Sequence, residues 1–144
     1  MKSIPMTKML RLSLAGDAVM SAAAGLLMVG GAGFLSQFLE LPQSLLAYAG
    51  IALIPYVIFL GMIARRASLS AALVWAVIGG NMFWSLASAL LLTMGLVSPN
   101  AFGYAFVIIQ AIAVLGFAEF QYLALRQASK GLAPNPVGSV AHAN

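Results

Sequence analysis

The chain has 144 residues, of which 62% are hydrophobic and 7% are charged, and its mean hydropathy is +1.02. Soluble domains carry about 25% charged residues, so this composition excludes that class and predicts an all-α integral membrane protein. The chain has no cysteine, which excludes disulfide bonds, thiol catalysis and thiolate metal sites. Its net charge of +4 comes from scattered basic residues, and this dispersion argues against nucleic acid as a partner.

Long segments without charge divide the chain into candidate membrane spans, because a bilayer core of about 30 Å takes ~20 helical residues. We expect four transmembrane helices, at about residues 12–35, 45–63, 69–93 and 102–125. The connectors are short and contain proline or charged residues, so consecutive helices should be antiparallel neighbours in one bundle. Residues 1–130 would form this four-helix domain, and residues 131–144 a disordered cytoplasmic tail.

Basic residues predict the orientation, since lysine and arginine near span ends stay on the cytoplasmic side. If both termini are cytoplasmic, every basic residue lies inside and the outer loops have none: Lys2, Lys8, Arg11, Arg65, Arg66, Arg126 and Lys130. We therefore expect a multi-pass protein of a bacterial-type inner membrane. Asp17 would interrupt the apolar core of a signal peptide, so the first span should be retained.

The first two spans contain features of close helix packing. Small residues concentrate in the first span, and residues 21–25 fit the small-xxx-small pattern. This pattern predicts packing within one bundle, with a homodimer face as the alternative. In the second span, Pro55 removes a backbone hydrogen bond and frees the carbonyl of Ile51. We expect a kink that neighbouring helices absorb, and a substrate-lining break is the alternative.

Two carboxylates fall inside the predicted spans at similar depth. Asp17 follows Arg11 by six residues and Glu119 precedes Arg126 by seven, which places both about 10 Å from the cytoplasmic basic residues. Because an unpaired carboxylate in hydrocarbon is costly, each should face the bundle, pair with a loop arginine such as Arg65, or bind a proton. A shared proton or cation site is one hypothesis. In the other, Asp17 caps the first helix near its start or reaches water, and Glu119 pairs with a loop arginine.

The third span carries uncharged polar residues far from either end. Asn81 lies about 18 Å deep, counted along the helix, and Ser85 and Ser88 follow it on the same face. Gln110 in the fourth span comes out at about the same depth, so we expect an Asn81–Gln110 amide pair between these helices. These four side chains would form interhelical hydrogen bonds or, as the alternative, line a pathway or ligand pocket.

The fourth span separates its polar residues between two faces. Gln110 and Glu119 are nine residues apart, which puts them on opposite sides of a helix, whereas Gln110 and Gln121 share one side. If Gln110 faces the third span, Glu119 should face another helix, a second protomer or lipid.

No catalytic or cofactor motif occurs in the sequence. The only histidine, His142, lies in the expected tail, which excludes histidine-ligated haem within the bilayer and a paired-histidine metal site from one chain. No phosphate-binding or dinucleotide-binding glycine motif is present, and a catalytic serine would lack a histidine base. We expect no enzyme activity, no cofactor and no metal.

In size and four-span plan, the chain resembles the small multidrug resistance transporters. That family carries a glutamate in the middle of its first helix, whereas the only acid in the first span here is Asp17, near the cytoplasmic end. Proton-coupled drug export therefore does not carry over. We expect a non-enzymatic membrane protein that is a structural or accessory partner of a larger membrane system. The alternatives are a small dimeric proton- or cation-coupled transporter or channel, and a membrane enzyme that handles a lipid or quinone.

Overall fold

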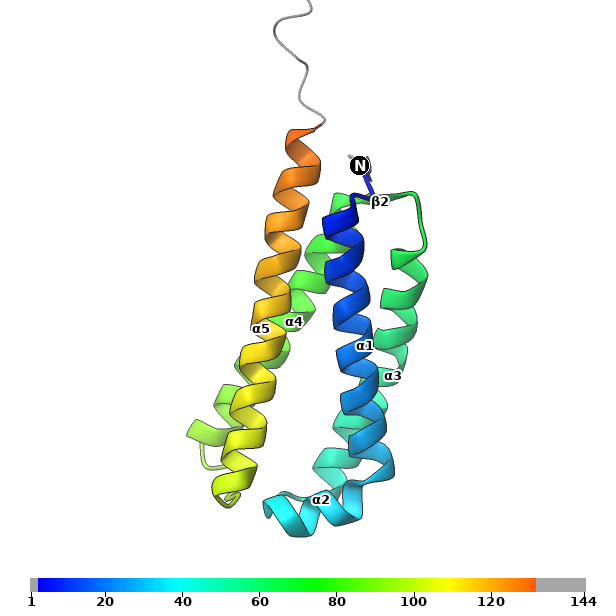
Figure 1. The fold of residues 1–144 in the computed structure, drawn as a ribbon. Coiled ribbons are helices and arrows are strands. Elements are labelled where there is room, and N and C mark those ends of the chain that lie inside the picture. Colours follow the sequence, from blue (N-terminus) through cyan, green and yellow to red (C-terminus); the bar gives the residue numbers. More distant parts are fainter. Residues whose placement is uncertain (1–2, 132–144) are drawn as a thin grey trace, which may run out of the picture.

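The computed structural model describes residues 3–131, which are mainly helical (Figure 1). The elements follow in the order β1 (Ser3–Pro5), α1 (Lys8–Gly30), α2 (Ala32–Leu39), α3 (Gln43–Ala64), β2 (Ser68–Ser70), α4 (Ala71–Thr93) and α5 (Ala101–Lys130). Helices α1, α3, α4 and α5 are long and apolar enough to cross a membrane. Lys2 and the predicted tail after Gly131 lie outside the described residues.

The four long helices form two pairs. Helix α1 packs along α3, helix α4 packs along α5, and α1 also contacts α5. Chain direction alternates, because α1 and α4 run away from the end at which β1 lies and α3 and α5 return to it (Figure 1). We expected all consecutive helices to be neighbours, but α3 and α4 have very few close backbone contacts. Each of them packs against its own pair partner instead.

Polar caps fix where three of the long helices begin. The side chains of Thr7, Ser70 and Asn100 each accept a hydrogen bond from a backbone N–H in the first turn of α1, α4 and α5, at 3.2, 3.3 and 3.0 Å. These bonds satisfy donors that a helix start leaves unpaired. The predicted spans begin close to these positions, but α5 continues to Lys130, beyond the predicted end at residue 125.

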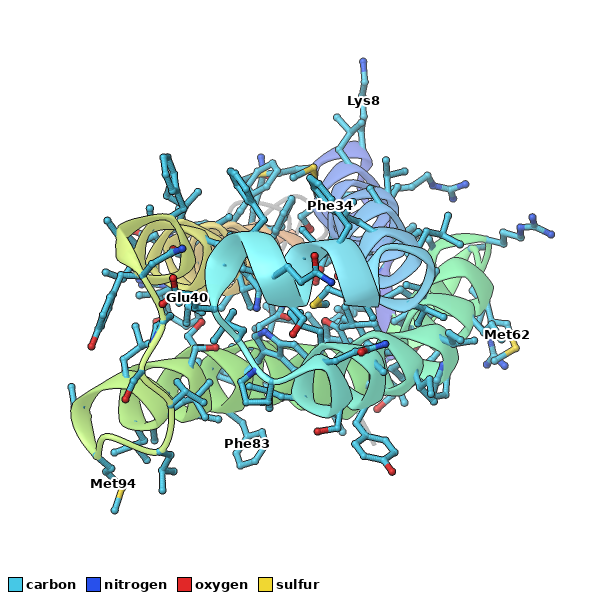
Figure 2. All side chains as sticks on the ribbon, turned by 90° about the horizontal axis from the view of Figure 1, so that it is seen from below. Lys8, Phe34, Glu40, Met62, Phe83 and Met94 are labelled. Carbon is cyan, nitrogen blue, oxygen red and sulfur yellow. The ribbon has the colours of Figure 1, made fainter. Side chains whose placement is uncertain are left out.

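The first predicted span differs most from the structure. Helix α1 ends at Gly30, and Gly31 turns the chain with φ −107° and ψ 10° while its N–H still donates to the carbonyl of Leu27 at 2.8 Å. The chain then forms α2, which ends at Glu40 in a left-handed conformation with φ 55°. Seen from the end of the molecule at which it lies, α2 crosses the space between the two helix pairs (Figure 2). The predicted first span merged α1 with part of α2, because both helices are apolar.

Two short strands tie the N-terminal segment to the α3–α4 connector. β1 pairs antiparallel with β2, with Ser3 opposite Ser70 and Ile4 opposite Leu69. Ile4 and Leu69 are buried, at 1% and 2% exposed. The sequence analysis did not predict this ribbon, because three-residue strands are too short to show an alternating pattern.

All basic residues that the structure describes lie at the end of the molecule that holds the two strands, which we call the basic end: Lys8, Arg11, Arg65, Arg66, Arg126 and Lys130 (Figure 1). The guanidinium of Arg11 donates to the backbone carbonyl of Arg66 at 3.4 Å, which links α1 to the end of α3. Glu40 lies at the opposite end, after α2. The basic residues therefore gather on one side, as the sequence predicted.

Small residues bring α1 and α3 into close contact. A Cβ atom on Gly50 would lie 2.7 Å from Cγ2 of Val29 and 3.0 Å from the carbonyl oxygen of Gly25. Gly25 belongs to the small-residue segment 21–25, so this segment packs within the chain, as predicted. The homodimer face stays a prediction.

The interior contains two apolar clusters on either side of a polar layer. The cluster toward the basic end includes Leu10, Leu14, Leu60, Val74 and Leu125. The cluster toward α2 includes Met28, Leu35, Leu46, Leu53 and Val107. The polar layer contains the candidate site.

Candidate functional site: a polar node beside an apolar cavity

Each long helix contributes one polar side chain to a central cluster, which we call the polar node: Asp17, Tyr56, Asn81 and Gln121. The Oδ2 atom of Asp17 accepts from the hydroxyl of Tyr56 at 2.9 Å, Nδ2 of Asn81 at 2.7 Å and Nε2 of Gln121 at 2.8 Å. The Tyr56 hydroxyl oxygen also lies 2.8 Å from Oδ1 of Asn81, and Nδ2 of Asn81 donates to Oε1 of Gln121 at 3.2 Å. The node therefore connects all four long helices.

The carboxylate of Asp17 lies in the interior with neutral partners only. Asp17, Asn81 and Gln121 are 1%, 3% and 0% exposed. The hydroxyl of Ser21 donates to Oδ1 of Asp17 at 3.1 Å, so all four donors to this carboxylate are uncharged. Within residues 3–131, every buried side-chain nitrogen and oxygen has a hydrogen-bond partner. Burial of polar groups costs little only when they are paired in this way.

The node residues lie at one level in the molecule. Counted from the helix ends at the basic end, Asp17, Tyr56, Asn81 and Gln121 lie nine, eight, ten and nine residues inward. At ~1.5 Å per residue, this level is about 12–15 Å from the basic end. The shared depth explains why these four side chains meet.

The expected Asn81–Gln110 pair does not form, because the amide of Asn81 bonds to Asp17 and Gln121. Gln110 lies on the same face of α5 as Gln121, three turns farther from the basic end. The prediction counted the depth of Gln110 from the outer end of the fourth span and that of Asn81 from the cytoplasmic start of the third. However, α5 has 30 residues against 23 in α4, so a count from the outer end of α5 misplaced Gln110.

The two carboxylates of the predicted proton or cation site do not meet. Asp17 is buried in the node, whereas Glu119 is exposed on the outer side of α5. The helical-angle argument for Glu119 thus agrees with the structure, and the shared site does not. Pairing of Asp17 with a loop arginine such as Arg65, one of the alternatives for this carboxylate, is also absent. Both Arg65 and Arg66 are exposed at the basic end, and Asp17 lies more than two turns inside α1.

The two serines of the third span have different roles. Ser85 donates to the backbone carbonyl of Ala111 at 3.0 Å, which links α4 to α5. Ser88 donates to the carbonyl of Trp84 at 2.8 Å, within its own helix. Ser85 thus forms the predicted kind of interhelical bond, and Ser88 does not.

A cavity of about 540 Å³ extends from the polar node toward α2, between the α1–α3 pair and the α4–α5 pair. Its walls are mostly apolar and aromatic, and include Met20, Leu53, Trp84, Phe106 and Phe117. Asp17, Tyr56 and Asn81 line its inner end, and Gln110 lines its wall farther along α5. Concave apolar sites with a few polar groups are the usual form of small-molecule sites.

Helix α2 closes the molecule at the far side of the cavity. The side-chain amide of Asn100 donates to the carbonyl of Phe38 at 2.9 Å, and the backbone N–H of Asn100 donates to the carbonyl of Leu39 at 3.2 Å. These bonds hold the start of α5 against the end of α2.

Pro55 has no part in the cavity. It lies within α3, which continues from Gln43 to Ala64, and its side chain is exposed. The cavity wall in this part of α3 is made by Ala52, Leu53 and Tyr56. A substrate-lining break at Pro55 is therefore not supported.

Sequence reasoning missed two of the four node residues, Tyr56 and Gln121. Gln121 was recognised as sharing a face with Gln110, but its depth was not compared with that of Asn81. Tyr56 carries a hydroxyl near the middle of the second predicted span, whereas the other tyrosine of that span, Tyr48, lies near its outer end. That central position was the available signal. Comparison with family models, with curated proteins and with solved structures finds no match to this chain.

Proposed function

We propose that the protein is a non-enzymatic, multi-pass protein of a bacterial-type inner membrane, with both termini cytoplasmic, that binds a membrane-soluble amphiphile in its central cavity. In this role it acts as an accessory partner of a larger membrane system. The observation that carries the proposal is the cavity itself, with apolar walls and polar groups at its inner end.

The outer surface supports the membrane assignment. Large apolar side chains cover it, and Leu26, Phe83 and Ile112 are 77%, 71% and 65% exposed. Phe83 and Met62 point away from the helices in Figure 2. Such a surface would be unfavourable in water but matches lipid. The basic end supports a cytoplasmic position for both described chain ends.

The cavity lining indicates the class of ligand. Its aromatic and aliphatic walls suit an acyl or isoprenoid tail, and the Gln110 amide could bond to a carbonyl or hydroxyl head group. Ser21, Ser85 and Ser88 all donate their hydroxyl protons to carboxylate or carbonyl oxygens. These bonds engage the serine hydroxyl protons within the protein, so the three serines do not offer a ligand a donor.

The test is whether the purified protein retains an amphiphile. We would extract protein purified in mild detergent and identify bound lipids and quinones by mass spectrometry. Ala113 lines the cavity on α5, whereas Ala105 is an exposed alanine on the same helix that does not line it. Wild type and Ala105→Phe should yield a stoichiometric amphiphile, and Ala113→Phe should lose it. A clean extract from wild type, or equal retention by both variants, would reject the binding role.

The accessory role has its own test. Native mass spectrometry of the gently solubilised protein should show it with other membrane subunits. A lone monomer or homodimer would contradict the accessory role and leave amphiphile binding to be decided by extraction.

A second candidate function is a small proton- or cation-coupled transporter. The observation that favours it is the carboxylate of Asp17, which lines the cavity and has only neutral donors. In liposomes that enclose a pH-sensitive dye, a pH gradient should collapse faster with wild type than without protein. Asp17→Asn should remove this difference, and Glu119→Gln should keep it because Glu119 is exposed on the outer side of α5. Equal rates with and without wild type would reject transport of protons.

A further inference from the structure

We propose that the line of oxygens Asp17 Oδ2, Tyr56 Oη and Asn81 Oδ1 is a proton-binding site that takes up one proton from the cavity. This inference does not depend on amphiphile binding, because it rests on hydrogen bonds within the node. It concerns a site made by three helices, and it assigns the ligand as a single proton.

The two contacts of the Tyr56 hydroxyl need more protons than an ionised Asp17 leaves available. Two oxygen–oxygen distances along this line, 2.9 Å from Tyr56 to Asp17 and 2.8 Å from Tyr56 to Asn81, are hydrogen-bond distances. Each such contact needs one proton. When Asp17 is ionised, only the single hydroxyl proton of Tyr56 is available for the two contacts. One contact then brings two acceptors together without a proton.

Reversing the side-chain amide of Asn81 does not remove the need for a second proton. Its Nδ2 atom lies 2.7 Å from Oδ2 of Asp17 and 3.2 Å from Oε1 of Gln121. A reversed amide would place its oxygen against these two acceptors. The amide nitrogen of Gln121 likewise lies against Asp17, at 2.8 Å. The orientation in which Asn81 Oδ1 faces Tyr56 is therefore the favourable one.

Among cationic ligands, a proton fits the surroundings of Asp17 better than a metal ion or an organic cation. The groups that face it are Tyr56 from α3, Asn81 from α4, Gln121 from α5 and Ser21 from its own helix, and the donors among them are neutral. Tyr56 is the only one of these four that titrates. Since Asp17 is 1% exposed, a metal or organic cation would have to displace the amide donors to reach it. A proton needs no such space.

Tyr56 provides the route between the cavity and the carboxylate. It is the one node residue that is only partly buried, and it lines the cavity. A hydronium ion in the cavity gives a proton to Tyr56 Oη as the original hydroxyl proton of Tyr56 moves to Asp17 Oδ2. One water molecule remains, Asp17 becomes a neutral acid, and Tyr56 keeps one proton that it donates to Asn81 Oδ1. Both short contacts then contain a proton.

The experiment is infrared spectroscopy of the full chain in lipid bilayers during an acid–base titration. Asp17 is the only aspartate in the chain, so carboxyl-¹³C aspartate marks its carboxyl band without any substitution. We expect a protonated-carboxyl band that appears on acidification, shifts with the isotope and is lost in Asp17→Asn. Tyr56→Phe should move its frequency or the pH at which it appears, because Tyr56 bonds directly to Asp17.

Glu119→Gln provides the matched control, since Glu119 is exposed on α5, and it should leave the isotope-sensitive band unchanged. The proposal would be overturned if no isotope-sensitive acid band appears at any pH at which circular dichroism shows folded protein. It would also be overturned if that band appears but is the same in Tyr56→Phe. Labelling keeps the test decisive even if Asp17→Asn does not fold. A positive band with a clean lipid extract would retain the proton site and reject amphiphile binding.

Discussion

The two halves of the molecule differ in how closely the helix pairs approach. In the half toward the basic end, α5 presents small buried residues to the interior, Ala124 and Ala128, at 0% and 1% exposed. In the half toward α2, α5 presents Phe106 and Phe117 to the cavity. Small side chains let helices pack closely, whereas large rings hold them apart unless the opposite wall fills the space. The difference in side-chain size on one helix therefore accounts for a closed half and an open half.

The polar node lies at the boundary between these halves. On one side, Leu14, Leu60 and Val74 are fully buried, at 0% exposed. On the other side is the cavity, and Tyr56 is the node residue most accessible from it. This arrangement gives the node access from one side only. A buried carboxylate at such a boundary can respond to the contents of the cavity without contact with the basic end.

Substitution of Asn81 should have the largest effect, because it removes the residue that joins the two helix pairs at the boundary between the halves. Asn81→Ala deletes the bonds to Asp17, Tyr56 and Gln121 and leaves buried polar atoms without partners. We expect a loss of about 3 kcal/mol in the free energy of unfolding. Reversible unfolding in mixed micelles would measure it.

The matched control is Gln110→Ala, which changes an amide on the cavity wall outside the node. It should alter the free energy of unfolding by no more than about 0.5 kcal/mol. If the two alanine variants were equally stable, the node would not be the element that joins the two helix pairs.

A leucine in each half provides a second comparison, with a smaller expected effect. Leu60 is 0% exposed in the closed half, whereas Leu27 lines the cavity and is 51% exposed. Leu60→Ala should cost about 2 kcal/mol of unfolding free energy, at the low end for buried leucines because lipid replaces water as the reference. Leu27→Ala should cost much less, since few protein atoms surround it. Equal losses of unfolding free energy in the two variants, measured in the same micelles, would mean that side chains fill the cavity around Leu27.

The apolar helices and the gathering of basic residues could be predicted from the sequence, because both depend on composition over long stretches. The end of α1 at Gly31 could not, since Gly30 and Gly31 lie in a continuous apolar run. What separates α1 from α2 is the packing of α2 across the bundle end, where Leu35 and Leu39 are buried. Local hydropathy does not contain that information.

The candidate site could be predicted in part. Asp17 and Asn81 were identified because polar groups are costly in apolar spans, and the angle between Gln110 and Glu119 correctly separated Glu119 from the interior. The choice of partners failed, because it required the length of α5. Counted from the helix ends of the structure, Asn81 and Gln121 lie ten and nine residues inward. The predicted end of the fourth span at residue 125 would have placed Gln121 only four residues inward, so the pairing could not follow from the sequence.

The smallest expected effect concerns the link between α4 and α5 beside the cavity. Ser85 donates to the carbonyl of Ala111 across these helices, whereas Ser88 donates within α4. Polar contacts between membrane helices contribute about 0.6 kcal/mol on average, so Ser85→Ala should lower the unfolding free energy by about that amount. Ser88→Ala should change it less, because α4 keeps its own backbone bonds without this hydroxyl. The same micelle titration would measure both variants. A larger loss for Ser88→Ala than for Ser85→Ala would contradict the assignment of the Ser85 bond as the polar link between α4 and α5.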